Sequence, residues 1–332
     1  MPTRLAAAAL AAAFAAVLAL PAAAKEVVRF AYLADPSHEA VMWALKNGKV
    51  TSDTIEVEAD ALQIPALIQA TAARSYDVVQ TAGMAIPRAR ARGLDLRIIG
   101  TALRYHAEGE GADVWVPADS EIQTAEDLKG KTVAVYSIGS SGVTLVRIAL
   151  ANAHGLDVAL EGGDLELVEM PAPGMPAALS AGRVDAATLI HAQAFEARKT
   201  GAFRSIASTA VDNYEAFGVR MVSAVLAGYG DKLDAEPEKH REFLRLLHES
   251  VEYVRENPDE VFAAVGEETD VDPAFFETWF AEFSEFPVLL SEDDVEAIGV
   301  LWREAETLGL LEDAPPVEET VWSETLRASE VE

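Results

Sequence analysis

The sequence predicts an α/β protein with two similar lobes, each with a doubly wound, mainly parallel sheet, and a helical C-terminal portion. Strand-like and helix-like runs alternate from residue 27 to residue 209. Segment 64–80 also resembles segment 175–190, since in both a Pro-started helix leads through an Asp into an apolar strand. From residue 237 onward the pattern is mostly helical. Repeated βαβ alternation is typical of parallel sheets with helices on both faces.

The predicted strands are apolar runs or runs that alternate with period two. In the run 54–60 the alternation is strict, as in a half-buried strand. The strands expected in chain order are 27–33, 54–60, 77–81, 95–103, 112–117, one beginning at 133, 165–170, 185–190 and 203–209.

Capping signals mark several of the predicted helices. Pro65 suits a first helical turn, Thr124 and Asp127 form a capping box, and Gly48 and Gly155 suit helix C-termini. The helices expected in chain order are 38–48, 64–74, 84–93, a short turn near 124–130, 140–155, 173–182, one from about 191, 237–257, 258–266, 272–283 and 291–309.

A strand, a tight turn and a helix follow one another in Val133–Leu150, with Gly139, Ser140, Ser141 and Gly142 in the turn. The glycines lack the spacing of a dinucleotide fingerprint, no Lys follows as in a P-loop, and the order does not match a nucleophile elbow. The turn therefore serves as a helix start with a Ser as N-cap. Because the first helical N–H groups lack intrahelical partners, we also expect an anionic group of a ligand there.

The composition excludes several classes of function. The 332 residues include 55 acidic and 26 basic side chains, a formal net charge of −29, which disfavours binding to nucleic acids and to anionic membranes. There are no cysteines, which excludes disulfides, thiol catalysis and Cys-bound metals. His106 with Glu108 and Glu110 lies in a Gly-rich joint and makes no metal motif. We expect neither a cofactor nor a metal.

The N-terminal residues have the pattern of a secretory signal peptide. Arg4 precedes an apolar run that ends at Leu20, and Ala22–Ala24 supplies an A-x-A cleavage site. The run is shorter than the roughly 20 apolar residues that span a bilayer. We expect residues 1–24 to be removed before Lys25, which leaves a periplasmic protein with no stable membrane insertion.

Two long stretches resemble a known family. "TAEDLKGKTVAVYSIGSSGVTLVRIALANAHGLD" (124–157) and "LVEMPAPGMPAALSAGRVDAATLIHAQAFEA" (167–197) are similar to the second lobe of periplasmic substrate-binding proteins of ABC importers. The branch concerned binds alkanesulfonates, taurine, nitrate or pyrimidine precursors of thiamine. Residues 77–100 resemble the strand–helix–strand of the family's first lobe, and the helical end with 275–283 also fits.

The resemblance implies the type II periplasmic binding protein fold, with a hinge of two crossing strands. Lobe 1 is then expected to contain residues 25–105 and 219–332, and lobe 2 residues 106–218. The polar stretches near 105–111 and 210–220 are the expected crossings. The resemblance implies a monomer that captures a small-molecule ligand between its lobes and passes it to an ABC importer permease.

Ligands of such proteins contact the loops that follow the strands, as in open α/β sheets generally. Asp35 is expected to cap the helix that begins at Pro36. The ligand-binding residues expected from this mapping are Tyr32, Thr81, Gly83, Arg104, His106, Ser140, Ser141, Gly142 and His191.

Several of these residues also have a purely structural interpretation. Tyr32 suits packing at the lobe edge, Thr81 and Gly83 suit a helix start, Arg104 suits a surface ion pair, and His191 suits a position beside a helix cap. In the functional interpretation, Arg104 provides the charged partner for an anionic ligand at the turn.

Three classes of function follow from these observations. The first is a non-enzymatic exported protein that delivers a small polar or anionic solute, such as a sulfonate, nitrate, a carboxylate or a pyrimidine, to an importer. The second is an exported sensor that docks on a membrane receptor. The third is an enzyme related to those that make the thiamine pyrimidine, but those relatives resemble one another in a Cys-rich iron-binding motif that this chain lacks.

Overall fold

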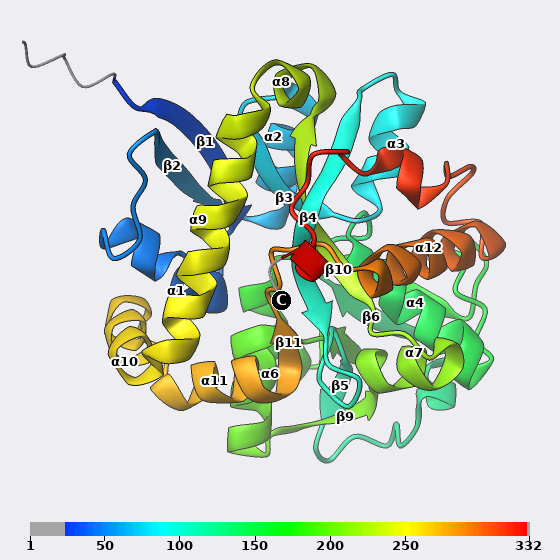
Figure 1. Ribbon diagram of the computed structural model, residues 1–332. Helices are drawn as coiled ribbons and strands as arrows, with labels where there is room; N and C mark the ends of the chain where they lie inside the picture. The colour runs from blue at the N-terminus through cyan, green and yellow to red at the C-terminus, as the bar shows by residue number, and fades with distance from the viewer. Residues whose placement is uncertain (1–23, 331–332) are drawn as a thin grey trace, which may run out of the picture.

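The computed structural model describes residues 24–330, so the expected signal peptide lies outside the described residues except for Ala24. Two lobes are present, each built on one sheet (Figure 1). The sheet of lobe 1 has the strand order β11-β4-β10-β3-β1-β2, and the sheet of lobe 2 has the order β7-β6-β8-β5-β9. Each sheet carries its own hydrophobic core. The predicted two-lobe α/β fold is therefore confirmed.

The strands of lobe 1 are β1 (Glu26–Leu33), β2 (Ile55–Leu62), β3 (Val78–Ala82), β4 (Leu96–Tyr105), β10 (Val222–Tyr229) and β11 (Ser284–Glu285). The strands of lobe 2 are β5 (Val114–Pro117), β6 (Lys131–Val135), β7 (Leu165–Glu169), β8 (Ala186–Thr188) and β9 (Phe203–Ala207).

Helices cover both sheets and form most of the C-terminal portion, as predicted. The first seven are α1 (Pro36–Lys46), α2 (Ile64–Ala73), α3 (Ala85–Ala91), α4 (Ser141–His154), α5 (Met175–Ser180), α6 (His191–Thr200) and α7 (Thr209–Phe217). The C-terminal ones are α8 (Gly230–Ala235), α9 (Pro237–Glu256), α10 (Pro258–Thr269), α11 (Pro273–Thr278) and α12 (Glu292–Thr307). Short 3-10 turns lie at Ala125–Leu128, Ala172–Gly174, Val317–Thr320 and Ala328–Glu330, and a π-helical turn lies at Trp279–Phe283.

The internal similarity predicted from the sequence is present in the backbone hydrogen bonds. The Asp77 carboxylate, just before β3, accepts the N–H of Arg29 at 2.9 Å, while its own N–H donates to the carbonyl of Arg29 at 2.8 Å. In lobe 2 Asp185 makes the same pair of bonds with Thr132, both at 2.9 Å. Each Asp thus ties the strand that follows a Pro-started helix to the neighbouring parallel strand.

In each sheet most strands run in the same direction, as predicted, and the remaining strands are antiparallel to them. β1 is parallel to β2 and β3, and β6 is parallel to β7 and β8. β10 is antiparallel to β3 and β4, and β5 is antiparallel to β8 and β9. The cause is the crossing of the chain between the lobes. A strand that enters a sheet from the junction begins where its neighbours end, so it runs in the opposite direction.

The two crossings lie next to each other at the centre of the molecule, where β4 and β10 run side by side (Figure 1). Residues 106–113 lead from β4 into β5, and residues 218–221 lead from α7 into β10. The N–H of Tyr105 donates to the carbonyl of Met221 at 3.0 Å, which joins the two crossings. We propose 105/106 and 218/219 as the lobe boundaries.

Capping residues fix where α1 begins and where α4 begins and ends. Asp35 caps α1 by accepting the N–H of Ser37, as expected from the Pro that follows it. Ser140 caps α4 by accepting the N–H of Val143, and Gly155 ends that helix with φ of 63°. Both N-caps lie at the junction of the lobes, directly after β1 and after the turn that follows β6.

Candidate ligand-binding site

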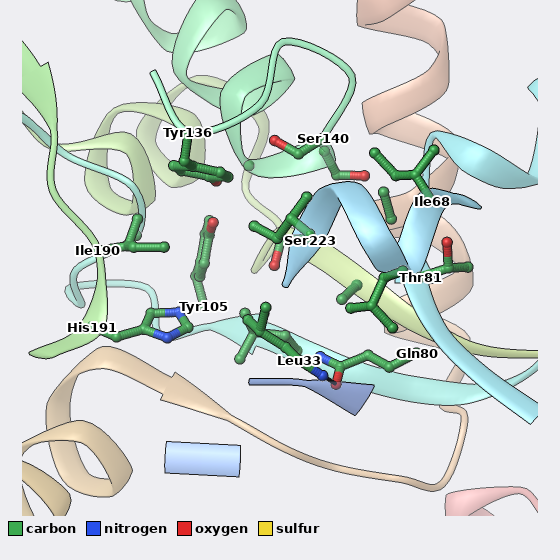
Figure 2. Close-up of a pocket in the computed structure, with 18 residues that line it drawn as sticks. Leu33, Ile68, Gln80, Thr81, Tyr105, Tyr136, Ser140, Ile190, His191 and Ser223 are labelled. Carbon is green, nitrogen blue, oxygen red and sulfur yellow. Dashed lines mark hydrogen bonds between the residues drawn. The ribbon is translucent and has the colours of Figure 1, made fainter. Parts of the chain in front are cut away.

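A pocket lies between the lobes and has about 670 Å³ of empty space, including its open mouth. It is formed by the ends of β1, β3 and β4 and by α2 from lobe 1, and by the starts of α4 and α6 from lobe 2. Figure 2 shows these side chains around the common space. The lining residues are Leu33, Ile64, Leu67, Ile68, Gln80, Thr81, Ala82, Leu103, Tyr105, Gly111, Tyr136, Ser140, Ser141, Gly142, Ile190, His191, Ser223 and Ala224.

Five of the nine residues expected from the sequence line this pocket. They are Thr81, Ser140, Ser141, Gly142 and His191. The other four, Tyr32, Gly83, Arg104 and His106, are not among the lining residues.

Strand alternation explains why Tyr32 and Arg104 lie elsewhere. Successive side chains of a strand point to opposite faces, so Leu33 faces the pocket while the Tyr32 hydroxyl donates to Glu39 at 2.8 Å. In the same way Leu103 and Tyr105 line the pocket, and Arg104 between them points away.

Arg104 forms ion pairs within lobe 1, in agreement with the structural role that the sequence also allowed. Its guanidinium donates to Asp294 at 2.8 Å and also pairs with Glu285. His106 lies beside the same carboxylate, with Nδ1 3.4 Å from Glu285. The charge of Arg104 is therefore neutralised within lobe 1, which removes it as the partner of an anionic group at the α4 turn. Gly83 contributes its carbonyl to Trp302 Nε1 at 3.1 Å.

The start of α4 forms the polar end of the pocket. Ser140 takes the N–H of Val143, so Ser141 and Gly142 are the first helical residues beside the empty space. A side chain at Gly142 would force Tyr136 or the start of α4 to move, because a Cβ there would lie 1.9 Å from the hydroxyl oxygen of Tyr136. Burial raises the pKa of Tyr136 to about 12, so its hydroxyl stays neutral and able to donate.

The wall that lobe 1 contributes is mostly apolar. Leu33, Ile64, Leu67, Ile68 and Leu103 face the pocket, and Ile68 is 41% exposed beside it. No Lys, Arg, Asp or Glu is among the lining residues. An occupant of this pocket therefore meets hydrophobic side chains on one side and hydroxyls, helix N–H groups and one imidazole on the other.

Sequence reasoning missed several polar lining residues. Tyr136 immediately precedes the turn and Tyr105 ends a strand, so the rule that ligands contact strand ends would have found both. Gln80 lies within β3, and Ser223 lies near the beginning of β10. Ser223 had no comparable signal, since only the pairing of β10 with β3 and β4 brings it to the site.

Asp35, His38 and His191 bring ligand atoms of the type that binds metals within 4.8 Å of one another. The hydrogen bonds of His38 argue against coordination. Gln80 Oε1 accepts the N–H of Leu33 at 3.0 Å, which directs its amide nitrogen to His38 Nε2 at 2.8 Å. The other ring nitrogen lies 3.2 Å from the hydroxyl oxygen of Ser37. Both nitrogens of this imidazole are thus occupied, so His38 belongs to a hydrogen-bonded network with Ser37, Asp35 and Gln80. His191 Nδ1 lies beside this network, 3.0 Å from Asp35 Oδ2.

Replacing Ser141 by Ala is expected to lower the free energy of unfolding by about 1–3 kcal/mol. The Ser141 hydroxyl accepts the N–H of Met84 at 3.0 Å, which links α4 of lobe 2 to lobe 1, and both residues are fully buried. The substitution leaves that N–H without an acceptor. Urea denaturation gives the change. Ser205→Ala on β9, an exposed site, is the control. Equal stability of the two variants would contradict a stabilising role of the hydrogen bond between Met84 and Ser141.

Solved structures similar to this chain include two sulfonate-binding proteins. The periplasmic aliphatic sulphonate binding protein SsuA from Escherichia coli is 16% identical, with 91% of this chain and 94% of that chain covered and a TM-score of 0.69. The alkanesulfonate-binding protein SsuA from Xanthomonas axonopodis pv. citri, bound to MOPS, is 19% identical, with 90% and 99% covered and a TM-score of 0.69. These structures show the type II periplasmic binding protein fold.

An enzyme also shares the fold. The desulfurization enzyme DSZB is 16% identical, with 90% of this chain and 96% of that chain covered and a TM-score of 0.60. No curated protein sequence matches the chain. A family model described as NMT1/THI5 like matches residues 35–261, which is more than half of the 332 residues. The resemblance to substrate-binding proteins of ABC importers is thereby confirmed, and the chain belongs to the NMT1/THI5-like family.

Proposed function

We propose that this protein is an exported, non-enzymatic carrier that captures a small polar or anionic solute between its lobes and delivers it to an ABC importer permease. The observation that carries the proposal is the pocket at the lobe junction, which both lobes line. The solved relatives named as sulfonate-binding proteins support the same role.

The proposed export to the periplasm rests on the N-terminal sequence. The N-terminal residues carry the pattern of a cleavable signal peptide. In the described part of the chain, residues 24–330, no helix has the length and apolar character needed to cross a bilayer. Intact-mass analysis of protein from a periplasmic extract is expected to give a chain that begins at Lys25, and retention of residues 1–24 in the membrane fraction would contradict it.

The polarity of the pocket narrows the solute class. The polar or anionic group belongs at the start of α4, where helix N–H groups and the hydroxyls of Ser140 and Ser141 lie. The remaining part of the solute contacts the apolar wall of lobe 1. Sulfonates, carboxylates and pyrimidines with an apolar body fit this arrangement better than nitrate, which has no apolar surface to bury.

We propose a carrier rather than an enzyme because the solved structures named as sulfonate-binding proteins share this fold over about nine tenths of the chain. In residues 24–330 no Ser or Thr hydroxyl is hydrogen-bonded to His191, the one imidazole that lines the pocket. A Ser–His nucleophile requires that contact. The monomeric state and the permease as partner stay part of the proposal.

A thermal-shift panel on the mature protein tests the proposal, with sulfonates, nitrate, carboxylates, amino acids and pyrimidines as ligands. A solute at 100 times its Kd is expected to stabilise the folded state by about 2.7 kcal/mol. Leu67→Trp fills the pocket and is expected to abolish the shift, whereas Leu160→Trp, at a site 54% exposed, is the control. A pocket-filled variant that still responds would place the solute elsewhere.

Lobe closure is tested by small-angle scattering on the same protein. The lobes touch in this structure, through Arg88 Nη1 and the carbonyl of Gly139 at 2.8 Å and through Ser141 and Met84. Saturation with a solute from the panel is expected to reduce the radius of gyration, because a ligand that contacts both lobes favours their closure. An unchanged radius at saturation would indicate a rigid site.

A further inference from the structure

A buried pair of residues joins the two lobes at the edge of the pocket. Asp35 precedes α1 in lobe 1, and His191 begins α6 in lobe 2. Asp35 Oδ2 lies 3.0 Å from His191 Nδ1, and each side chain is 9% exposed. In the described residues 24–330 this is the one ion pair between the lobes with both partners buried. The other pairs that cross the lobe boundaries are more exposed: Lys199 with Asp272, Arg198 with Glu282, and His106 with Glu285.

The attraction within this pair depends on a proton. At 3.0 Å the two atoms are close enough for a hydrogen bond, but His191 Nδ1 makes none of acceptable geometry. A neutral imidazole therefore gains little from Asp35. An imidazolium gains a charge–charge attraction that tolerates the poor angle, in surroundings where water does not screen it.

Asp35 is built to stay ionised. Its Oδ1 accepts both the N–H of Ser37 at 2.9 Å and the hydroxyl of Ser37 at 2.5 Å. Burial by itself raises the pKa of Asp35, but the attraction of the nearby His191 and His38 rings outweighs burial and holds this pKa well below its ordinary value. The partner of His191 is thus a carboxylate whose other oxygen is held by Ser37.

The other groups that surround His191 are neutral or more remote. The ring of His38 on α1 stacks on it at a centroid distance of 5.9 Å, and burial lowers the pKa of His38, which favours its neutral form. Trp279 closes another side at 6.2 Å. Tyr105 on β4 lies beside His191 at the pocket (Figure 2), and burial raises its pKa, so the phenol stays neutral. Glu39 on α1 adds a negative charge that acts on His38.

The backbone of His191 also points to a functional role. Its φ is +48°, in the left-handed region that non-glycine residues seldom adopt. Strained residues of this kind persist where the surrounding structure holds them, often at ligand-binding sites. The conformation places one ring nitrogen against Asp35 while the imidazole lines the pocket.

We propose that Asp35 acts across the lobe junction as a positioning residue for His191, and that protonation of His191 latches the lobes closed over the solute. Asp35 does not line the pocket, so it acts through His191. Because the closed form binds the extra proton, acid favours closure and alkali favours opening. This proposal depends on the opening and closing of the lobes that the proposed function assumes. It does not depend on which solute binds.

The test measures the distance between the lobes in solute-free protein. The chain has no cysteine, so Gln69→Cys on α2 and Gly174→Cys in lobe 2 attach two spin labels at defined places. Both positions are exposed, and a side chain at Gly174 meets nothing within 4 Å. Pulsed dipolar spectroscopy then gives the ratio of closed to open molecules at pH 5 and pH 8, the range in which histidines commonly titrate.

The ratio of closed to open molecules is expected to fall at least about tenfold from pH 5 to pH 8. Asp35→Asn is expected to abolish this dependence while keeping the helix cap, because Asn caps as well as Asp. His191→Gln is expected to do the same. Asp272→Asn removes the exposed inter-lobe pair with Lys199 and is expected to leave the dependence intact.

Two results would overturn the latch: a ratio that does not change with pH, or an Asp35→Asn protein that keeps the change. Circular dichroism verifies that each variant is folded. The spin-label experiment contains no solute, so a negative result would refute the latch without refuting solute capture. A negative result in the thermal-shift panel would refute solute capture at the pocket without refuting the latch.

Discussion

Replacing Gly142 by Ala is expected to weaken solute binding at least tenfold and to lower the free energy of unfolding by about 1–3 kcal/mol. The added Cβ would lie 1.9 Å from the Tyr136 hydroxyl oxygen and 3.4 Å from that of Tyr105. Phenol rings are rigid, so either Tyr136 or the start of α4 has to move. Both border the polar end of the pocket. Urea denaturation measures the stability, and calorimetry with a solute from the panel measures the binding.

Gly139 provides the matched control within the same turn. A Cβ at Gly139 would meet only Arg88 Nη1 and Ile68 Cδ1, both at 4.0 Å. Gly139→Ala is therefore expected to keep both stability and binding. If Gly139→Ala and Gly142→Ala behave alike, the effect belongs to the loss of a glycine in the turn, and the assignment of the α4 start as the polar end of the site fails.

The second large effect is expected at Asp113, which is buried where the first crossing enters β5. Burial and the charge of Glu110 raise the pKa of Asp113 to about 8, although the N–H groups of Thr209 and Gly111 favour its ionised form. Burial also raises the pKa of Glu110 to about 7, although Arg198 lies 2.6 Å away. We expect Asp113→Asn to stabilise the protein by about 2–4 kcal/mol at pH 8.

Proton linkage explains why Asp113→Asn is expected to raise the free energy of unfolding. In the unfolded chain Asp113 loses its proton near pH 4, and in the folded protein it keeps the proton up to about pH 8. Between these values the folded state binds more protons, so the contribution of Asp113 to the free energy of unfolding falls as the pH rises and levels off above pH 8. Asn has no proton to lose, and its side-chain oxygen still accepts the N–H of Thr209, now 2.9 Å from Asp113.

Denaturation of the wild type and Asp113→Asn at pH 5 and pH 8 tests this expectation. The stabilisation by Asn is expected to be greater at pH 8 than at pH 5. Glu108→Gln removes an exposed carboxylate from the same crossing and is expected to change neither value. A gain from Asn that is the same at both pH values would contradict the raised pKa.

The local features of the chain were predictable from the sequence, because they depend on residues close together in it. Asp35 and Ser140 cap the helices expected after their loops. The capping box of Thr124 and Asp127 is present. The Asp that follows each Pro-started helix marks the repeated βαβ unit in both lobes. Because ligand sites lie at strand ends, this local knowledge also placed Ser141, Gly142 and His191 at the pocket.

The sequence by itself thus determined the two-lobe α/β fold, the family and the loops that border the site. Tertiary structure decided strand direction and side-chain partners, which depend on distant residues. β10 is antiparallel to β3 because the chain returns from the other lobe. Arg104 is neutralised by Glu285 and Asp294, from segments about 180 to 190 residues later. Asp35 meets His191 only because the lobes close on each other, and no local pattern records that contact.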